Sequence, residues 1–94
     1  MMLHLNEKQL LSLKNFLLTS EDAQALGGNE YTVDIFELDA PISLELCLLD
    51  DGIDVLAAAL LDYSDELEGW YISGRIEQAE ELRAALDKWN VFSQ

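Results

Sequence analysis

The fold of this chain is decided by one stretch near its middle, Ile42-Ser43-Leu44-Glu45-Leu46-Cys47-Leu48-Leu49-Asp50-Asp51-Gly52-Ile53-Asp54-Val55. Its first half alternates aliphatic residues with Ser43, Glu45 and Cys47, a pattern typical of a half-buried β-strand. The Asp-Gly pair that follows is a common hairpin turn. The stretch therefore predicts two antiparallel strands, over residues 42–49 and about 53–61.

Two structures compete for residues 53–61. Alanine and leucine fill most of this segment, and both are good helix formers. The preceding hairpin turn requires a returning strand instead. We take the strand as the prediction and keep the helix as the alternative.

Further strands are predicted on both sides of this hairpin. Upstream, Tyr31, Val33 and Ile35 alternate with polar residues and predict a strand over 31–38. The change of parity at Phe36 and Leu38 indicates either a bulge or a strand that is partly covered on both faces. Residues 39–41 contain a proline and predict a turn. Downstream, a polar loop over 63–69 leads into Trp70-Tyr71-Ile72-Ser73, which predicts a fourth strand.

Helices are predicted at both ends of the chain. Asn6 and Gln9 have the spacing of a capping box, and Leu10, Leu13 and Leu17 form an apolar stripe over a helix at 6–18. Ser20-Glu21-Asp22 predicts a second, short helix over 20–26, which ends at Gly27-Gly28. The last helix is predicted over 76–89, with Asn90 as its C-cap. Its apolar stripe consists of Ala79, Leu82, Leu86 and Trp89.

Together these elements predict one α+β domain over residues 1–94. Its expected architecture has two layers: an antiparallel meander of three to four strands, packed by the N-terminal and C-terminal helices. Half of the residues are hydrophobic, enough to form one modest core.

The acidic charge of the chain is unevenly distributed. There are 19 acidic and 5 basic side chains, a net charge of −14. The 60 residues from Asn15 to Gly74 contain 14 carboxylates and no lysine or arginine, whereas acids and bases cancel in the remainder. The whole net charge therefore belongs to this middle part of the chain, which contains the predicted meander and its loops.

The sequence disfavours a membrane-spanning protein and a secreted protein. No segment approaches the roughly 18 apolar residues of a membrane span. The first residues lack both a basic region and a long apolar run, so we expect no secretory signal. The single cysteine, Cys47, excludes an internal disulfide, and we expect it to be buried and inert. These features predict a cytoplasmic protein.

Catalytic and metal sites are also disfavoured. The only histidine, His4, lies near a terminus, where we expect an exposed side chain rather than a catalytic base. Residues 47–52 do not place oxygen ligands at the spacing of a calcium loop, and residues 62–67 lack its glycine, so at most a weak Ca²⁺ or Mg²⁺ site could form there. There is no glycine-rich phosphate loop. We expect no enzyme activity, no cofactor and no metal.

The acidic block leaves three explanations open. Acidic side chains keep a protein soluble without any partner, and a salt-adapted source would have the same bias. A segment of 60 residues without a cation nevertheless gives up local ion pairing, which favours a docking surface for a basic protein. Direct binding of nucleic acid or of an anionic membrane is disfavoured because both carry the same sign of charge.

The leading hypothesis is an inhibitor that occupies the basic surface of a protein acting on nucleic acid. Two settings fit it equally, a nuclease-toxin immunity protein and a phage anti-CRISPR or anti-restriction DNA mimic, as a monomer or a homodimer. The alternative is a small acidic chaperone or adaptor that binds an effector through an apolar groove. We expect Trp70 to pack in the core unless it serves as an interface anchor. The predicted partner-binding residues are Asp34, Glu37, Asp39, Glu45, Asp50, Asp51, Asp54, Asp62, Asp65, Glu66, Glu68, Trp70 and Tyr71.

Overall fold

One long strand organises the sheet of this protein. The computed structural model describes residues 1–36 and 41–88. Strand β5 (Gly52–Ser64) pairs along one edge with β4 (Ile42–Leu48). Its other edge is divided between β1 (Met2–His4), opposite its first residues, and β6 (Gly69–Arg75), opposite its last. The 13 residues of β5 are long enough for both partners.

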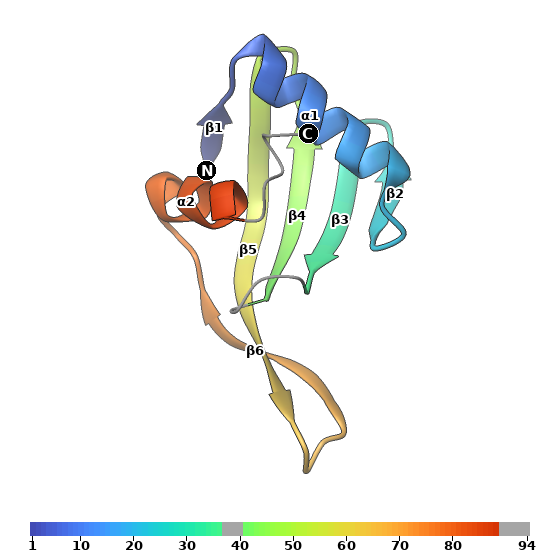
Figure 1. Ribbon diagram of the computed structural model, residues 1–94, viewed down its shortest axis with the longest axis vertical. Helices are drawn as coiled ribbons and strands as arrows, with labels where there is room; N and C mark the ends of the chain where they lie inside the picture. Colours follow the sequence, from blue (N-terminus) through green and yellow to red (C-terminus); the bar gives the residue numbers. More distant parts are fainter. Residues whose placement is uncertain (37–40, 89–94) are drawn as a thin grey trace.

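The sheet continues on the far side of β4 with β3 (Glu30–Ile35) and then β2 (Ala23–Gly27). All pairs are antiparallel, and the order is β1-β5-β4-β3-β2, with β6 beside β5 (Figure 1). The predicted α+β class with an antiparallel sheet is confirmed. The sheet of residues 1–36 and 41–88 has six strands, so β1 and β2 extend the predicted meander of three to four strands.

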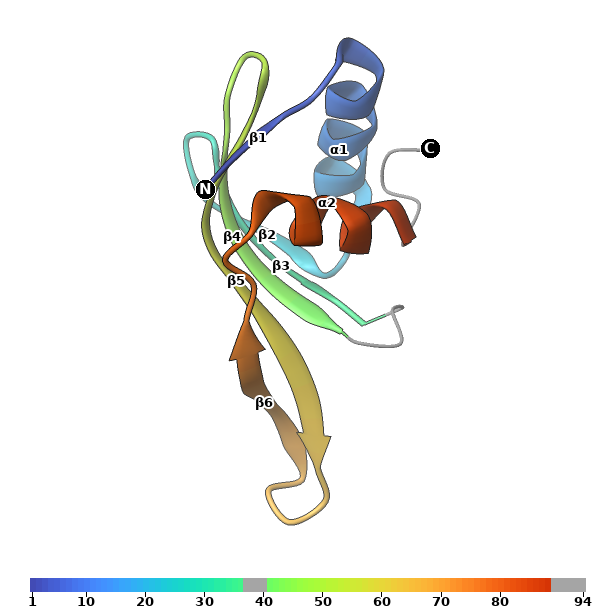
Figure 2. The same ribbon diagram turned by 90° about the vertical axis from the view of Figure 1, so that its left-hand side faces the viewer.

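Both helices lie on the same face of the sheet (Figure 2). Helix α1 (Glu7–Thr19) and helix α2 (Ala79–Lys88) bury one side of each central strand. The core formed between the two layers consists of Leu3, Leu5, Leu10, Leu13, Phe16, Leu17, Val33, Ile35, Ile42, Leu44, Leu46, Ile53, Val55, Ala58, Ile76, Leu82 and Leu86.

Helix α1 begins with the capping box that the sequence predicts. The Gln9 backbone N–H donates to Asn6 Oδ1 at 2.8 Å, and the Asn6 backbone N–H donates to Gln9 Oε1 at 3.2 Å. These bonds satisfy amide groups that the helix itself leaves without partners. The apolar stripe also contains Phe16, whereas the neighbouring Leu11 and Leu18 are exposed.

Helix α2 is shorter than predicted, because it begins at Ala79 rather than at residue 76. Leu82 and Leu86 are almost fully buried, as their spacing predicts. Trp89 and Asn90 lie outside the described residues. The guanidinium of Arg83 donates from Nη2 to the backbone oxygen of His4 at 2.7 Å, which connects α2 to β1.

The short helix predicted over 20–26 is wrong. Residues 21–22 form a turn, and Ala23–Gly27 form β2. Of the two glycines that were expected to end a helix, Gly27 instead ends β2 and Gly28 begins the turn into β3, both with positive φ (129° and 57°). Pairing with β3 therefore outweighs the helix propensity of residues 23–26.

The segment over 53–61 is a strand, as predicted, and it extends to Ser64. The segment 63–69, predicted as a loop, contains the end of β5 and the start of β6, and β6 continues to Arg75 rather than ending at residue 73. Strand β3 ends at Ile35, and the expected residues 37 and 38 of that strand lie outside the described residues.

Bulges explain the irregular apolar pattern of the strands. The register between β4 and β5 shifts so that Leu56 is the extra residue, and Ser73 is the extra residue between β5 and β6. Each bulge inverts the alternation beyond it. On β5 the side chains that pack in or against the core are therefore odd-numbered at Ile53 and Val55 but even-numbered at Ala58 and Leu60.

Gly52 is the closest point of contact between β1 and β5. A Cβ at this position would overlap the backbone oxygen of Leu3. Because β1 is held there by pairing with Gly52, Ile53 and Asp54, the strand has no room to move away. We predict that Gly52→Ala lowers the free energy of unfolding by about 2 kcal/mol or more, as overpacking does. Urea denaturation checks this value.

Gly69→Ala is the matched control. The nearest atom to a Cβ at Gly69 is 3.9 Å away, and its φ is not positive. We expect a change within about 0.5 kcal/mol of the wild type at this exposed hairpin. Equal effects of the two substitutions would contradict the close approach of β1.

Candidate binding surface

The face of the sheet opposite the helices carries most of the polar strand residues. Directly paired residues of an antiparallel sheet point to the same side. Because Val33, Leu44, Leu46 and Val55 point to the helices, their strand neighbours point away. We call this side the open face and define it by Glu30, Thr32, Asp34, Ser43, Glu45, Cys47, Asp54 and Ala57.

Four carboxylates lie on the open face. The register places Glu30 and Asp54 on either side of Cys47, and Glu45 between Thr32 and Ala57. Asp34 lies opposite Ser43, at the other end of β3. Strands in a sheet are about 5 Å apart, so Glu30 and Asp54 are roughly 10 Å apart across the sheet. The carboxylates thus form a spaced array rather than one cluster.

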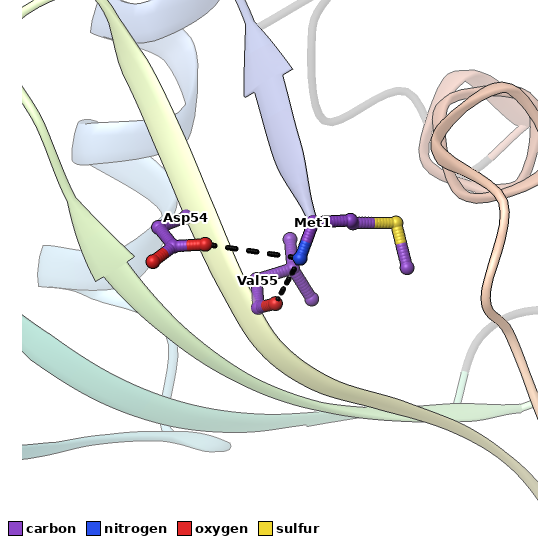
Figure 3. Close-up of polar contacts among 3 residues, drawn as sticks. All are labelled: Met1, Asp54 and Val55. Carbon is purple, nitrogen blue, oxygen red and sulfur yellow. Dashed lines mark hydrogen bonds and ion pairs between the residues drawn. The ribbon is translucent and has the colours of Figure 1, made fainter.

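One of these carboxylates already has a cation beside it. The ammonium group of Met1 lies 3.7 Å from Asp54 Oδ1 and donates a hydrogen bond to the backbone oxygen of Val55 at 2.8 Å (Figure 3). The Asp54 side chain is 41% exposed, so solvent screens this pair. Asp54 consequently contributes less negative charge to the open face than Glu30, Asp34 or Glu45.

Two acidic turns lie at opposite ends of β5. Asp50 and Asp51 precede its first residue, and Asp65, Glu66 and Glu68 follow its last. A strand of this length is roughly 40 Å long, comparable to the longest dimension of the molecule, 43 Å. The structure therefore does not bring these two groups of predicted site residues together.

The end of the β5–β6 hairpin projects beyond the rest of the sheet (Figures 1 and 2). Ladder pairing with β4 ends at Leu60, and the backbone N–H of Leu61 still donates to the backbone oxygen of Pro41 at 2.8 Å, so residues 62–64 pair only with β6. A two-stranded ribbon has marginal stability by itself in water. Side-chain contacts must therefore support this part of the hairpin.

An aromatic cluster provides that support. Tyr63 and Trp70 are direct cross-strand partners, with ring centroids 5.4 Å apart in an edge-on arrangement. The ring of Phe36, which follows β3, lies 5.1 Å from that of Trp70. We call Phe36, Tyr63 and Trp70 the aromatic cluster. It joins the hairpin to the end of β3.

The expectation that Trp70 packs in the core is wrong, because 49% of the residue is exposed. Tyr63 is exposed to the same extent, and Phe36 to 38%. The cluster gives the rings partial cover while leaving much of their surface in solvent. Its three members therefore belong to the candidate surface.

Tyr71 and Asp62 form a separate pair on the hairpin. They are cross-strand partners one position away from Tyr63 and Trp70, so they lie on the opposite face of the ribbon. The Tyr71 hydroxyl donates to Asp62 Oδ2 at 3.4 Å. These two predicted residues therefore do not share the surface of the aromatic cluster.

Three of the other predicted binding residues lie together on the sheet. Asp34, Glu45 and Asp54 share the open face, whereas Glu37 and Asp39 lie outside the described residues. Cys47 is only partly buried, contrary to the expected buried thiol, because it points to the open face. The His4 side chain is 74% exposed and lies 4.0 Å from a carboxylate oxygen of Asp51.

Sequence reasoning missed Glu30, Phe36 and Tyr63 as surface residues. Glu30 preceded the first residue of the expected strand, and Tyr63 fell in the expected loop. The signal for Tyr63 was its symmetry with Trp70 about the turn at residues 65–68, since equal distances from a turn make cross-strand partners. Nothing local indicates that Phe36 reaches Trp70.

Among residues 1–36 and 41–88, no three side chains of the metal-binding types are grouped to hold an ion. Within the same residues, neither helix has the apolar length that crossing a bilayer requires. No family model, curated protein or solved structure matches this chain.

The contact between Phe36 and Trp70 can be measured by a double-mutant cycle. We predict that the Phe36→Ala and Trp70→Ala substitutions are coupled by about 0.5–1.5 kcal/mol in free energy of unfolding, because aromatic pairs contribute that much beyond burial. Leu26 on β2 supplies the control. It is exposed and lies at the opposite edge of the sheet, so the Leu26→Ala and Trp70→Ala substitutions should be additive.

Proposed function

We propose that this protein binds the basic surface of a protein that acts on nucleic acid and blocks that surface. The observation that carries the proposal is the open face, on which Glu30, Asp34 and Glu45 have no ion pair among the described residues. No helix described here covers this side of the sheet. A face with carboxylates spaced over β3, β4 and β5 can meet a basic surface along several strands at once.

The amount of charge is consistent with competition against nucleic acid. A duplex as long as the molecule, 43 Å, carries roughly 25 phosphate charges, of which about half face one side. The open face and the two turns of β5 present nine carboxylates over that length: Glu30, Asp34, Glu45, Asp50, Asp51, Asp54, Asp65, Glu66 and Glu68. The two quantities have the same order.

Electrostatic complementarity also accelerates the encounter with a basic partner. An inhibitor that must reach a nuclease or a defence protein before nucleic acid does so benefits from this property. The setting as an immunity protein and the setting as an anti-CRISPR or anti-restriction protein both remain within the proposal.

A second function is favoured by a different observation. The β5–β6 hairpin exposes Leu67, Trp70 and Ile72, and Ile72 is 61% exposed. Exposed apolar side chains on one projecting element are typical of an interaction site. A small chaperone or adaptor that holds an apolar segment of an effector would use this hairpin. Such binding would persist in about 1 M salt, where the Debye length is near 3 Å.

The experiment compares wild type with a variant in which Glu30, Asp34 and Glu45 are changed to their amides. Tagged protein is used to capture partners from its native host, and the captured protein is assayed for nucleic-acid binding. We expect wild type to retain a basic protein, release it in high salt and inhibit its binding of nucleic acid. The amide variant should bind at least tenfold more weakly, because three charge contacts are lost.

The control variant removes three carboxylates elsewhere: Glu21→Gln, Glu81→Gln and Asp87→Asn. These residues are exposed and lie on α2 or in the turn after α1, so the net charge changes equally without changing the open face. Equal weakening by both variants would show a general charge effect and contradict docking on the open face. Retention in high salt that depends on the hairpin would favour the chaperone.

A further inference from the structure

The aromatic cluster has exposed ring surface that no described residue uses. Trp70 and Tyr63 are each 49% exposed although both contact another ring. Fold stability alone does not require a tryptophan at this position, since a smaller apolar residue could also cover Tyr63. Half-exposed tryptophan and tyrosine side chains are common anchors of protein interfaces.

The charge around the cluster indicates what can bind there. The ring faces of tryptophan and tyrosine are electron-rich and attract cations. The turn that carries Asp65, Glu66 and Glu68 lies directly between Ser64 and Gly69, the residues next to Tyr63 and Trp70. Its backbone is therefore within roughly 10 Å of the rings. The chain has no basic residue between Lys14 and Arg75, so this segment supplies no cation of its own.

A second copy of the chain fits this site poorly. A symmetric contact between two hairpins would bring two acidic turns into one interface, and each copy has a net charge of −14. An apolar segment would leave the neighbouring carboxylates without a counter-charge. A cationic side chain is complementary both to the ring faces and to the acidic turn.

Arginine matches the site better than lysine. Its guanidinium group is planar, stacks on aromatic faces and is more weakly hydrated than an ammonium group. The same group can donate two parallel hydrogen bonds to a carboxylate. Stacking on Trp70 and pairing with a turn carboxylate are therefore compatible in one side chain.

We propose that the aromatic cluster binds an arginine side chain of the basic partner, with Trp70 as the stacking platform and the acidic turn as the source of counter-charge. This inference rests on the proposed function, since it names the side chain by which a basic partner is held. In this arrangement the projecting end of the hairpin selects arginine over lysine, and the open face attracts any basic surface.

The test uses two blocked peptides of equal length and charge, nona-arginine and nona-lysine, in about 0.15 M salt. Dissociation constants are measured by calorimetry for the full chain. Quenching of Trp70 fluorescence is measured in a Trp89→Phe background, which leaves Trp70 as the single tryptophan. We expect wild type to bind the arginine peptide at least about fivefold more tightly than the lysine peptide.

Trp70→Leu removes the ring and keeps an apolar side chain. We expect this variant to lower the preference for arginine over lysine at least about threefold, because the stacking contribution is lost. Leu26→Ala, an exposed apolar residue on β2, should leave the preference unchanged. Tyr63→Leu is the second test variant, to be used if Trp70→Leu does not fold, and it should also lower the preference.

The outcomes separate this inference from the proposed function. A preference that is the same in wild type and both cluster variants overturns the arginine site but leaves docking on the open face intact. Binding of neither peptide, or tighter Trp70-dependent binding of a neutral amphipathic peptide, also overturns it. Loss of partner binding in the amide variant of the open face bears on the proposed function alone.

Discussion

The structure depends on one strand having three partners. Every strand has two edges, and β4 takes one edge of β5 from Ile53 to Leu60. The other edge is divided between a strand from the start of the chain and a strand from its last third. Because β5 is long enough to serve both, strands β1 and β6, which are far apart in the sequence, are anchored on the same element. The helices can then cover one face of a single sheet.

The close contact at Gly52 arises because β1 pairs with the first residues of β5, on the edge that β5 shares between β1 and β6. β1 has only three residues, so its position rests on a few backbone bonds and on burial of Leu3 against the core. A side chain at Gly52 would occupy the place of the Leu3 carbonyl group. The glycine at this position is therefore explained by the approach of β1 and not by a left-handed turn conformation, since its φ is not positive.

The periodicity of apolar residues predicted the strands and helices that bury one face along their whole length. The alternation of Ile42, Leu44 and Leu46 identified β4, and the spacing of Leu82 and Leu86 identified α2. Secondary structure was predicted less well where pairing with a neighbouring strand, rather than the local sequence, determines it. Residues 23–26 have good helix propensity and little burial, so only the partner strand β3 makes them a strand. β1 was missed because three residues carry too little periodicity to recognise.

The sequence predicted how many carboxylates the candidate surface could use, but not how they are arranged on the sheet. Counting acids located the net charge between Asn15 and Gly74, and Glu45 and Asp54 do share a face. The strand predicted over residues 53–61 already lies between Asp51 and Asp65, and β5 lengthens that separation to 13 residues. The bulge at Leu56 also inverts which residues face the helices, so the alternation could not assign faces beyond it.

The projecting hairpin has a consequence for how this surface can vary among related chains. Ladder pairing with β4 ends at Leu60, and the contact of Trp70 with Phe36 lies on the sheet side of the turn, so among the described residues the acidic turn beyond Ser64 is held only by the hairpin itself. Adding or removing two residues in each strand would keep every side chain on its face and move the acidic turn by about 7 Å. A change of one residue in each strand would exchange the two faces. Insertions or deletions of two residues in each strand would therefore change how far the hairpin projects from the sheet and leave each side chain on its face.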